Sequence, residues 1–177
     1  MNIKDLTVHP KPQNNNAKVA FLITLLISAV GFAVYFVIEK YRGVVGMFAL
    51  LTLVTAILFY TKYICPNFYY DITADSDGVP IFVVRQIIGK RQTTLCRIDL
   101  ANIRALVSEV KEERRAHKTP SGYRKYVYAP TLLPPKVYRI TVVGRYEKAE
   151  IIIECSDEFA SYLSECVKEA ENFAEEE

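Results

Sequence analysis

Two long apolar runs near the N-terminus constrain this chain more than any other feature. The run at 19–38, VAFLITLLISAVGFAVYFVI, has no charged residue in 20 positions, and the run at 43–63 has none before Lys62. At about 1.5 Å per residue, a helix of about 20 residues matches the thickness of the hydrocarbon core of a bilayer. The alternative is a pair of core helices in a soluble protein, but two such runs in close succession rarely occur there. The sequence therefore predicts a transmembrane helical hairpin over 19–63.

The connection between the two runs is Glu39-Lys40-Tyr41-Arg42, which is too short for anything but antiparallel neighbouring helices. Small residues that could let these helices approach closely are Ala29, Ala33, Gly43 and Gly46. Cations at the outer ends of the hairpin outnumber those in the connection: Lys4, Lys11, Lys18 and Lys62 against Lys40 and Arg42. The two runs predict a two-pass protein of the cell membrane, and the side with more cations is expected to be the cytoplasmic one. Both termini are then cytoplasmic, and residues 1–18 form a polar tail.

From Pro66 onward, apolar and polar residues alternate with a period of two between turn residues, which is typical of β-strands. The predicted strands are 68–73, 79–87, 93–100, 103–110, 126–129, 137–144 and 149–155. The last part of the chain has helical periodicity instead. One face of this helix carries Phe159, Leu163, Cys166, Val167, Ala170 and Phe173, and Ser156 and Asp157 can cap its start. We expect an α+β domain over 66–174, in which the amphipathic helix covers the sheet.

Seven strands followed by one helix is the order of elements in the pleckstrin-homology superfold. With the hairpin in front, and with the stretch FYYDITADSDGVPIFVVRQIIGKRQTTLCRIDLANI, the chain resembles small bacterial two-helix membrane proteins with a bacterial pleckstrin-homology-like domain. The resemblance implies a seven-stranded antiparallel barrel or sandwich closed by the C-terminal helix. One departure is the turn after the first strand of the domain, which is basic in eukaryotic phosphoinositide-binding members but carries Asp75 and Asp77 here.

The sequence contains no set of residues that would indicate catalysis. It has no GxSxG, HExxH or CxxC motif and no glycine-rich phosphate loop, and His9 and His117 fall in a predicted tail and a predicted loop. The DSDG turn lacks the further oxygen ligands that a calcium loop needs. We therefore expect a protein that is not an enzyme, with no cofactor, no metal and no identifiable small-molecule substrate.

The segment 111–125, KEERRAHKTPSGYRK, is the most charged stretch of the domain. It has a formal charge of +4, whereas 66–177 as a whole has 16 Lys and Arg against 18 Asp and Glu. The absence of a broad basic surface argues against nucleic acid as a partner. Near a membrane, such a segment would face anionic headgroups; the alternative is a solvated loop without a partner. The candidate contacts to lipid or to a partner are Arg114, Arg115, Lys118, Arg124 and Lys125.

These observations favour a membrane-anchored module that acts as a binding or scaffold domain for a protein, a peptide or anionic lipid headgroups at the cytoplasmic surface. An alternative is an accessory subunit of a larger membrane complex, bound through the hairpin to a membrane protein or to a second copy of itself. A membrane-surface enzyme is a third hypothesis, for which the sequence nominates no residue.

Overall fold

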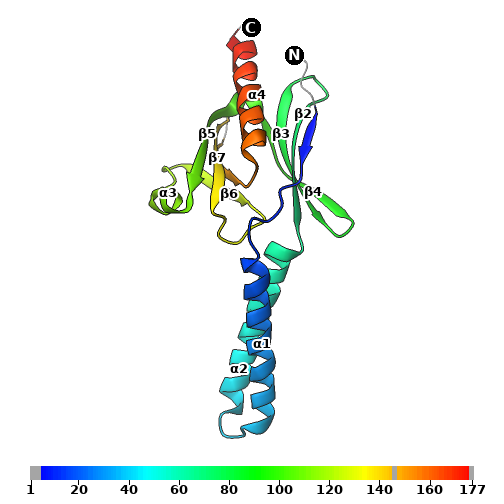
Figure 1. Cartoon of the computed structure of the whole chain (residues 1–177), viewed down its shortest axis with the longest axis vertical. Helices are drawn as coiled ribbons and strands as arrows, with labels where there is room; N and C mark the ends of the chain where they lie inside the picture. The colour runs from blue at the N-terminus through cyan, green and yellow to red at the C-terminus, as the bar shows by residue number, and fades with distance from the viewer. Residues whose placement is uncertain (1–4, 145–146, 176–177) are drawn as a thin grey trace. The chain divides into compact units, whose positions relative to one another are not determined.

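The structure is a computed structural model that describes residues 5–144 and 147–175 (Figure 1). The chain forms two compact units. One is a helical hairpin within Asn14–Pro66, and the other is a β-domain built from the described parts of Met1–Gln13 and Asn67–Glu177.

The helical hairpin consists of α1 (Asn16–Val37) and α2 (Arg42–Phe59), and α2 continues into a π-helical turn, η1 (Tyr60–Ile64). Both helical segments are long and apolar enough to cross a membrane. Most of their large apolar side chains are exposed within the unit, the reverse of what a core helix of a soluble protein shows. The two predicted helices are thus confirmed as helices, with apolar surfaces suited to contact with lipid.

Small residues pack the two helices together, and one of the four that the spacing suggested, Gly46 of α2, is among them: an added Cβ would lie 3.0 Å from the ring of Tyr35 of α1. Gly31 faces Ala49 so closely that an added Cβ would lie 3.0 Å from the Ala49 Cβ. Ser28 Oγ donates a hydrogen bond of 3.0 Å to the carbonyl oxygen of Ala49. Ala29 and Ala33, by contrast, are exposed on the other side of α1. The predicted close approach therefore occurs at Gly46, and also at Ser28 and Gly31, which lie three residues apart on the face of α1 that meets Ala49.

The first sheet of the β-domain has the strand order β1-β2-β3-β4, and all its neighbours are antiparallel. Its strands are β1 (Leu6–Val8), β2 (Asn67–Ala74), β3 (Pro80–Ile88) and β4 (Arg91–Asp99). Strand β1 comes from the segment that the sequence analysis treated as a polar tail. It precedes α1, yet it pairs with β2, which follows α2. If the two helices span a membrane, the N-terminal segment and the β-domain must therefore lie on the same side of it.

The second sheet has the order β5-β7-β8-β6. Its strands are β5 (Ile103–Val110), β6 (Tyr123–Tyr128), β7 (Lys136–Val143) and β8 (Lys148–Ile153). A short 3₁₀ helix, η2 (Leu100–Asn102), links the two sheets, and α3 (Lys111–Ala116) follows β5. Strand β6 runs parallel to β8, although the other pairs in this sheet are antiparallel.

The described residues therefore correct the predicted sheet in three respects. They contain eight strands in two four-stranded sheets rather than seven strands, because β1 is added to those that follow the hairpin. The arrangement is not wholly antiparallel, because β6 runs parallel to β8 at the edge of its sheet. No barrel is closed, since each sheet has two free edges in the described part of the chain. The coarser prediction of an α+β shape with a C-terminal helix is confirmed.

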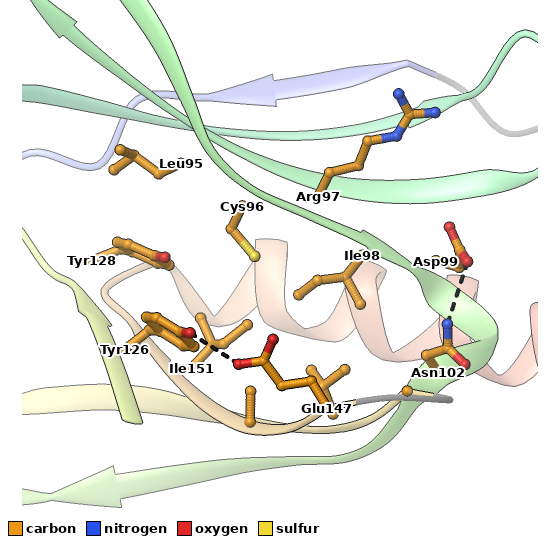
Figure 2. Close-up of a pocket in the computed structure, with 13 residues that line it drawn as sticks. Leu95, Cys96, Arg97, Ile98, Asp99, Asn102, Tyr126, Tyr128, Glu147 and Ile151 are labelled. Carbon is orange, nitrogen blue, oxygen red and sulfur yellow. Dashed lines mark hydrogen bonds between the residues drawn. The ribbon is translucent and has the colours of Figure 1, made fainter. Parts of the chain in front are cut away.

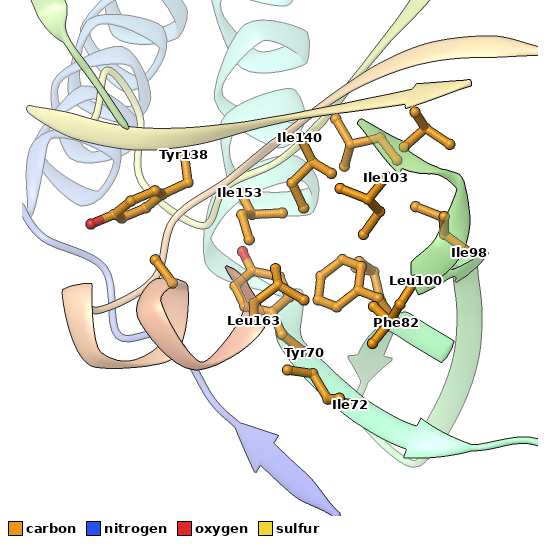
Figure 3. Packing of buried hydrophobic residues seen from close by; sticks show 14 of the residues in the cluster. Tyr70, Ile72, Phe82, Ile98, Leu100, Ile103, Tyr138, Ile140, Ile153 and Leu163 are labelled. Atoms are coloured by element: carbon orange, nitrogen blue, oxygen red, sulfur yellow. The ribbon is translucent and has the colours of Figure 1, made fainter. Parts of the chain in front are cut away.

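The hydrophobic core lies among the two sheets and α4 (Asp157–Glu175), as Figure 3 shows. Tyr70 and Ile72 from β2 and Phe82 from β3 are fully buried there, as the period-two pattern requires. Helix α4 contributes its apolar stripe, of which Phe159, Leu163, Cys166 and Ala170 are buried. Its first turn is capped by Ser156, whose Oγ accepts a hydrogen bond of 3.2 Å from the Phe159 amide. The predicted role of α4 as a cover for the sheets is therefore confirmed.

Candidate functional site

A groove of about 470 Å³ lies between β4 of the first sheet and β6 of the second (Figure 2). Each of these strands is the last in its sheet, so its outer backbone edge has no strand partner among residues 5–144 and 147–175. We call this groove the edge groove. Its lining comes from β4, η2, β6 and the β7–β8 hairpin: Leu95, Cys96, Arg97, Ile98, Asp99, Asn102, Tyr126, Tyr128, Val142, Gly144, Glu147, Ala149 and Ile151.

A β-bulge in β4 shapes one wall of the edge groove. Val84 of β3 faces Cys96, but its neighbour Arg85 faces Thr94, so Leu95 is an extra residue in β4. A bulge twists its strand and redirects side chains, and here both Leu95 and Cys96 line the groove. Burial raises the pKa of Cys96 to about 11, which keeps its thiol protonated at neutral pH. Cys96 therefore contributes a neutral thiol to the lining of the groove.

The other wall is aromatic and carries a polar rim. Tyr126 and Tyr128, two positions apart on β6, stack with ring centroids 6.2 Å apart. The Tyr126 hydroxyl donates to Glu147 Oε1 at 2.9 Å, and Arg124 lies 3.5 Å from the same oxygen. Burial raises the pKa of Tyr128 to about 12, so this phenol stays neutral. The groove thus offers an apolar floor, aromatic faces and a few fixed polar groups, which is the composition of a binding site.

A second cluster of polar residues lies on the outer face of the second sheet. Arg139 of β7 is only 3% exposed and donates from Nε and Nη2 to Glu109 at 2.6 and 2.7 Å. Its Nη1 donates to Glu150 at 2.7 Å. His117, which follows α3, lies with Nε2 2.9 Å from the other oxygen of Glu150. These four residues form what we call the charged cluster, and it ties the segment after α3 to the sheet.

The electrostatics of the charged cluster favour ionised carboxylates. Hydrogen bonds from Arg139 lower the pKa of Glu109 below its ordinary value, against the opposing effect of burial. For Glu150, burial disfavours the charge, but hydrogen bonds from Thr119 and His117 and the positive charge of Arg139 outweigh it and lower the pKa. Both carboxylates are thus satisfied by partners within the fold. Among the described residues, no group of His, Cys, Asp or Glu has the arrangement of a metal site.

We expect the charged cluster to make the β-domain unstable in acid. A carboxyl group whose pKa is lower in the folded than in the unfolded state stabilises the fold only while it is ionised. That stabilisation is complete above the ordinary glutamate pKa of 4.5 and is lost as the pH falls below it. Thermal unfolding of the detergent-solubilised chain should show a midpoint that drops steeply below that pH. The Glu109→Gln variant should show a shallower drop, and identical slopes for the two proteins would contradict the assignment.

The five cations proposed from the sequence belong to different elements of the β-domain. Arg114 and Arg115 belong to α3 and Lys118 follows it, whereas Arg124 and Lys125 are consecutive on β6 and so point to opposite faces of that strand. Arg124 is engaged with Glu147 at the rim of the edge groove. The segment 111–125 is therefore partly held to the sheet through His117, and its role in lipid contact stays a prediction.

Sequence reasoning missed both the edge groove and the charged cluster. The alternation in Tyr126-Val127-Tyr128 does indicate two aromatic rings on one face of a strand. It does not indicate that this strand ends a sheet, because strand order depends on pairing between distant segments. For the charged cluster, the signal was a Glu or Arg at an otherwise apolar strand position, as at Arg139 and Glu150.

No family model, curated protein or solved structure matches this chain.

Proposed function

We propose that this protein is a membrane-anchored binding module whose edge groove takes an extended peptide segment of a partner protein. The observation that carries the proposal is the pair of unpaired backbone edges, β4 and β6, on either side of a groove lined by both apolar and polar side chains. An extended peptide can satisfy such an edge with main-chain hydrogen bonds and place alternate side chains in the groove. Strand β4 has nine residues, enough to support a partner strand of ordinary length.

The proposal includes the finer features that the resemblance implies. A pleckstrin-homology-like arrangement is supported by two sheets that share a core with a C-terminal helix, whereas the parallel β6 departs from it. A cytoplasmic location is supported by the four lysines at the outer ends of the hairpin. A binding role without catalysis is supported by the neutral Cys96 and Tyr128 in the groove.

Site-specific photocrosslinking in native membranes tests the groove. A benzophenone amino acid in place of Tyr126 lies inside the edge groove, whereas the same group in place of Val127 lies on the opposite face of β6, where the native side chain is 58% exposed. We expect a discrete protein adduct from position 126 and none from position 127. Sequencing the adduct should place the crosslink within one short segment of a single partner protein.

A blocking variant makes this experiment decisive. Leu95→Arg places a charged side chain in the wall of the edge groove, at a bulge where the strand is already irregular. The adduct from position 126 should be lost in this background while the thermal midpoint of the protein is retained. Equal adducts from both positions, adducts that survive Leu95→Arg, or adducts with lipid alone would overturn the proposal.

A further inference from the structure

Chain connectivity identifies the residues of the β-domain that must stay close to the ends of the two helices. Only Cys65 and Pro66 separate the end of η1 from the start of β2, and only Asn14 and Asn15 separate Gln13 from the start of α1. Three peptide steps span at most about 10 Å. Whatever the angle between the two units, Gln13 and Asn67 must stay within about that distance of the ends of the two membrane-spanning helices.

The strand register identifies the first loop beside these tethers. Asn67 pairs with Ile87 near the end of β3, so the β3–β4 turn at residues 88–91 lies next to the start of β2. This turn has an exposed apolar residue, Ile88, which is 43% exposed. Gly89 follows with a positive φ of 60°, which a residue without a Cβ adopts readily. Lys90 and Arg91 are exposed, and neither forms an ion pair with any residue that the structure describes.

Hydrogen bonds identify the second loop. The Gln13 amide donates to Thr131 Oγ1 at 2.8 Å and to Glu154 Oε1 at 3.1 Å, and Gln13 Nε2 donates to the Lys136 carbonyl at 3.3 Å. The loop 129–135 is therefore held beside the tether to α1. Its tip is Leu133, which is 58% exposed and has a φ of 56°, a left-handed conformation that is unfavourable for leucine. The loop thus holds an apolar side chain outward at a conformational cost.

The two ends of β3 also differ in charge. The turn at the other end of β3 carries Asp77 and Asp75, of which Asp75 forms an ion pair with Arg97, whereas the turn beside the tether carries Lys90 and Arg91. A strand of nine residues separates the two turns by about 25 Å, well beyond the distance over which physiological salt screens a charge. An anionic surface that meets this domain would attract one end of the first sheet and repel the other.

We propose that residues 88–91 and the loop 129–135 form a membrane-docking surface for anionic lipids. Lys90 and Arg91 bind the headgroups, while Ile88 and Leu133 enter the boundary between headgroups and acyl chains. The surface is at the tethers rather than in the segment 111–125. It depends on the helices being in the bilayer but not on the edge groove binding a peptide.

The absence of tryptophan from this chain allows a direct test. Ile88→Trp, Leu133→Trp and Val79→Trp each introduce a single tryptophan in the full-length protein, reconstituted in vesicles that contain brominated lipids. Val79 is the matched control, because it adjoins the other end of β3 and is 42% exposed, almost as much as Ile88. We expect quenching at positions 88 and 133 to be about threefold stronger than at 79, because interfacial rings lie at headgroup depth. Equal quenching at all three positions would overturn the proposal.

A second comparison tests the charge. With Ile88→Trp as the reporter, quenching should be stronger in vesicles that contain phosphatidylglycerol than in pure phosphatidylcholine vesicles. Lys90→Ser with Arg91→Ser should abolish this difference, whereas Lys118→Ser with Lys125→Ser should preserve it. If the second pair abolished the difference and the first did not, the docking surface would instead be the segment 111–125. Photocrosslinking at Tyr126 is independent of these results, so failure of one proposal is distinguishable from failure of the other.

Discussion

Replacing Arg139 by alanine is expected to lower the free energy of unfolding of the β-domain by about 3–5 kcal/mol. The guanidinium donates to two buried glutamates, Glu109 and Glu150, which face each other across it on the outer side of the second sheet. Without it, two carboxylates remain buried with no strong cation between them. Each must then be protonated or become exposed, and either change costs more than the loss of the hydrogen bonds alone.

The matched control for this prediction is Arg104→Ala. Arg104 is an exposed arginine that lies 3.7 Å from Glu171, and an ion pair of this kind contributes about 0–1 kcal/mol. Urea unfolding of the detergent-solubilised full-length chain, followed by near-ultraviolet circular dichroism of its tyrosines, measures both variants. If Arg139→Ala and Arg104→Ala shifted the midpoint equally, the charged cluster would be no stronger than a surface pair. A triple replacement by apolar residues of similar size should recover most of the loss, because it leaves no charge unpaired.

Local patterns in the sequence were sufficient to predict the elements of this protein. Each of the two uncharged runs is a helix, and β2–β8 coincide with the seven predicted strands to within three residues at their ends. The predicted amphipathic stripe on α4 is buried, as at Phe159 and Leu163. These features could be predicted because each depends on a periodicity within about 20 residues, which the burial of one face imposes directly.

Long-range pairing could not be predicted in the same way. Leu6, Thr7 and Val8 form too short a strand to stand out, and their partners at 70–72 are separated from them by the whole hairpin. The parallel position of β6 beside β8 depends on the path of residues 111–122 across the sheet. The edge groove follows from this position of β6 together with the strand order of both sheets, so it cannot be predicted from local patterns. An isolated fragment starting at Pro66 would also lack β1 and leave the edge of β2 open.

Replacing Phe82 by alanine is expected to destabilise the β-domain by about 3–5 kcal/mol, as large-to-small changes in a closed core do. Phe82 has no exposed surface, and its ring lies 6.3 Å from that of Tyr70 and 6.5 Å from that of Phe159, centroid to centroid. It therefore joins β2, β3 and α4 at one point of the core (Figure 3). The cavity left by its ring would be bordered by a strand pair on one side and a helix on the other, and neither can move in to fill it without losing its own contacts.

Two further variants separate this cavity effect from a general effect of substitution in β3. Phe82→Leu keeps most of the apolar volume and should cost clearly less than Phe82→Ala, whereas Val79→Ala next to the start of the strand should change the midpoint little, because Val79 is exposed. Since α4 contacts Phe82 through Phe159, the alanine variant should also increase hydrogen exchange in α4 more than in β5. If protection from hydrogen exchange were lost only in β3 while α4 stayed protected, the helix would be held by its other contacts. The core would then be less cooperative than its packing indicates.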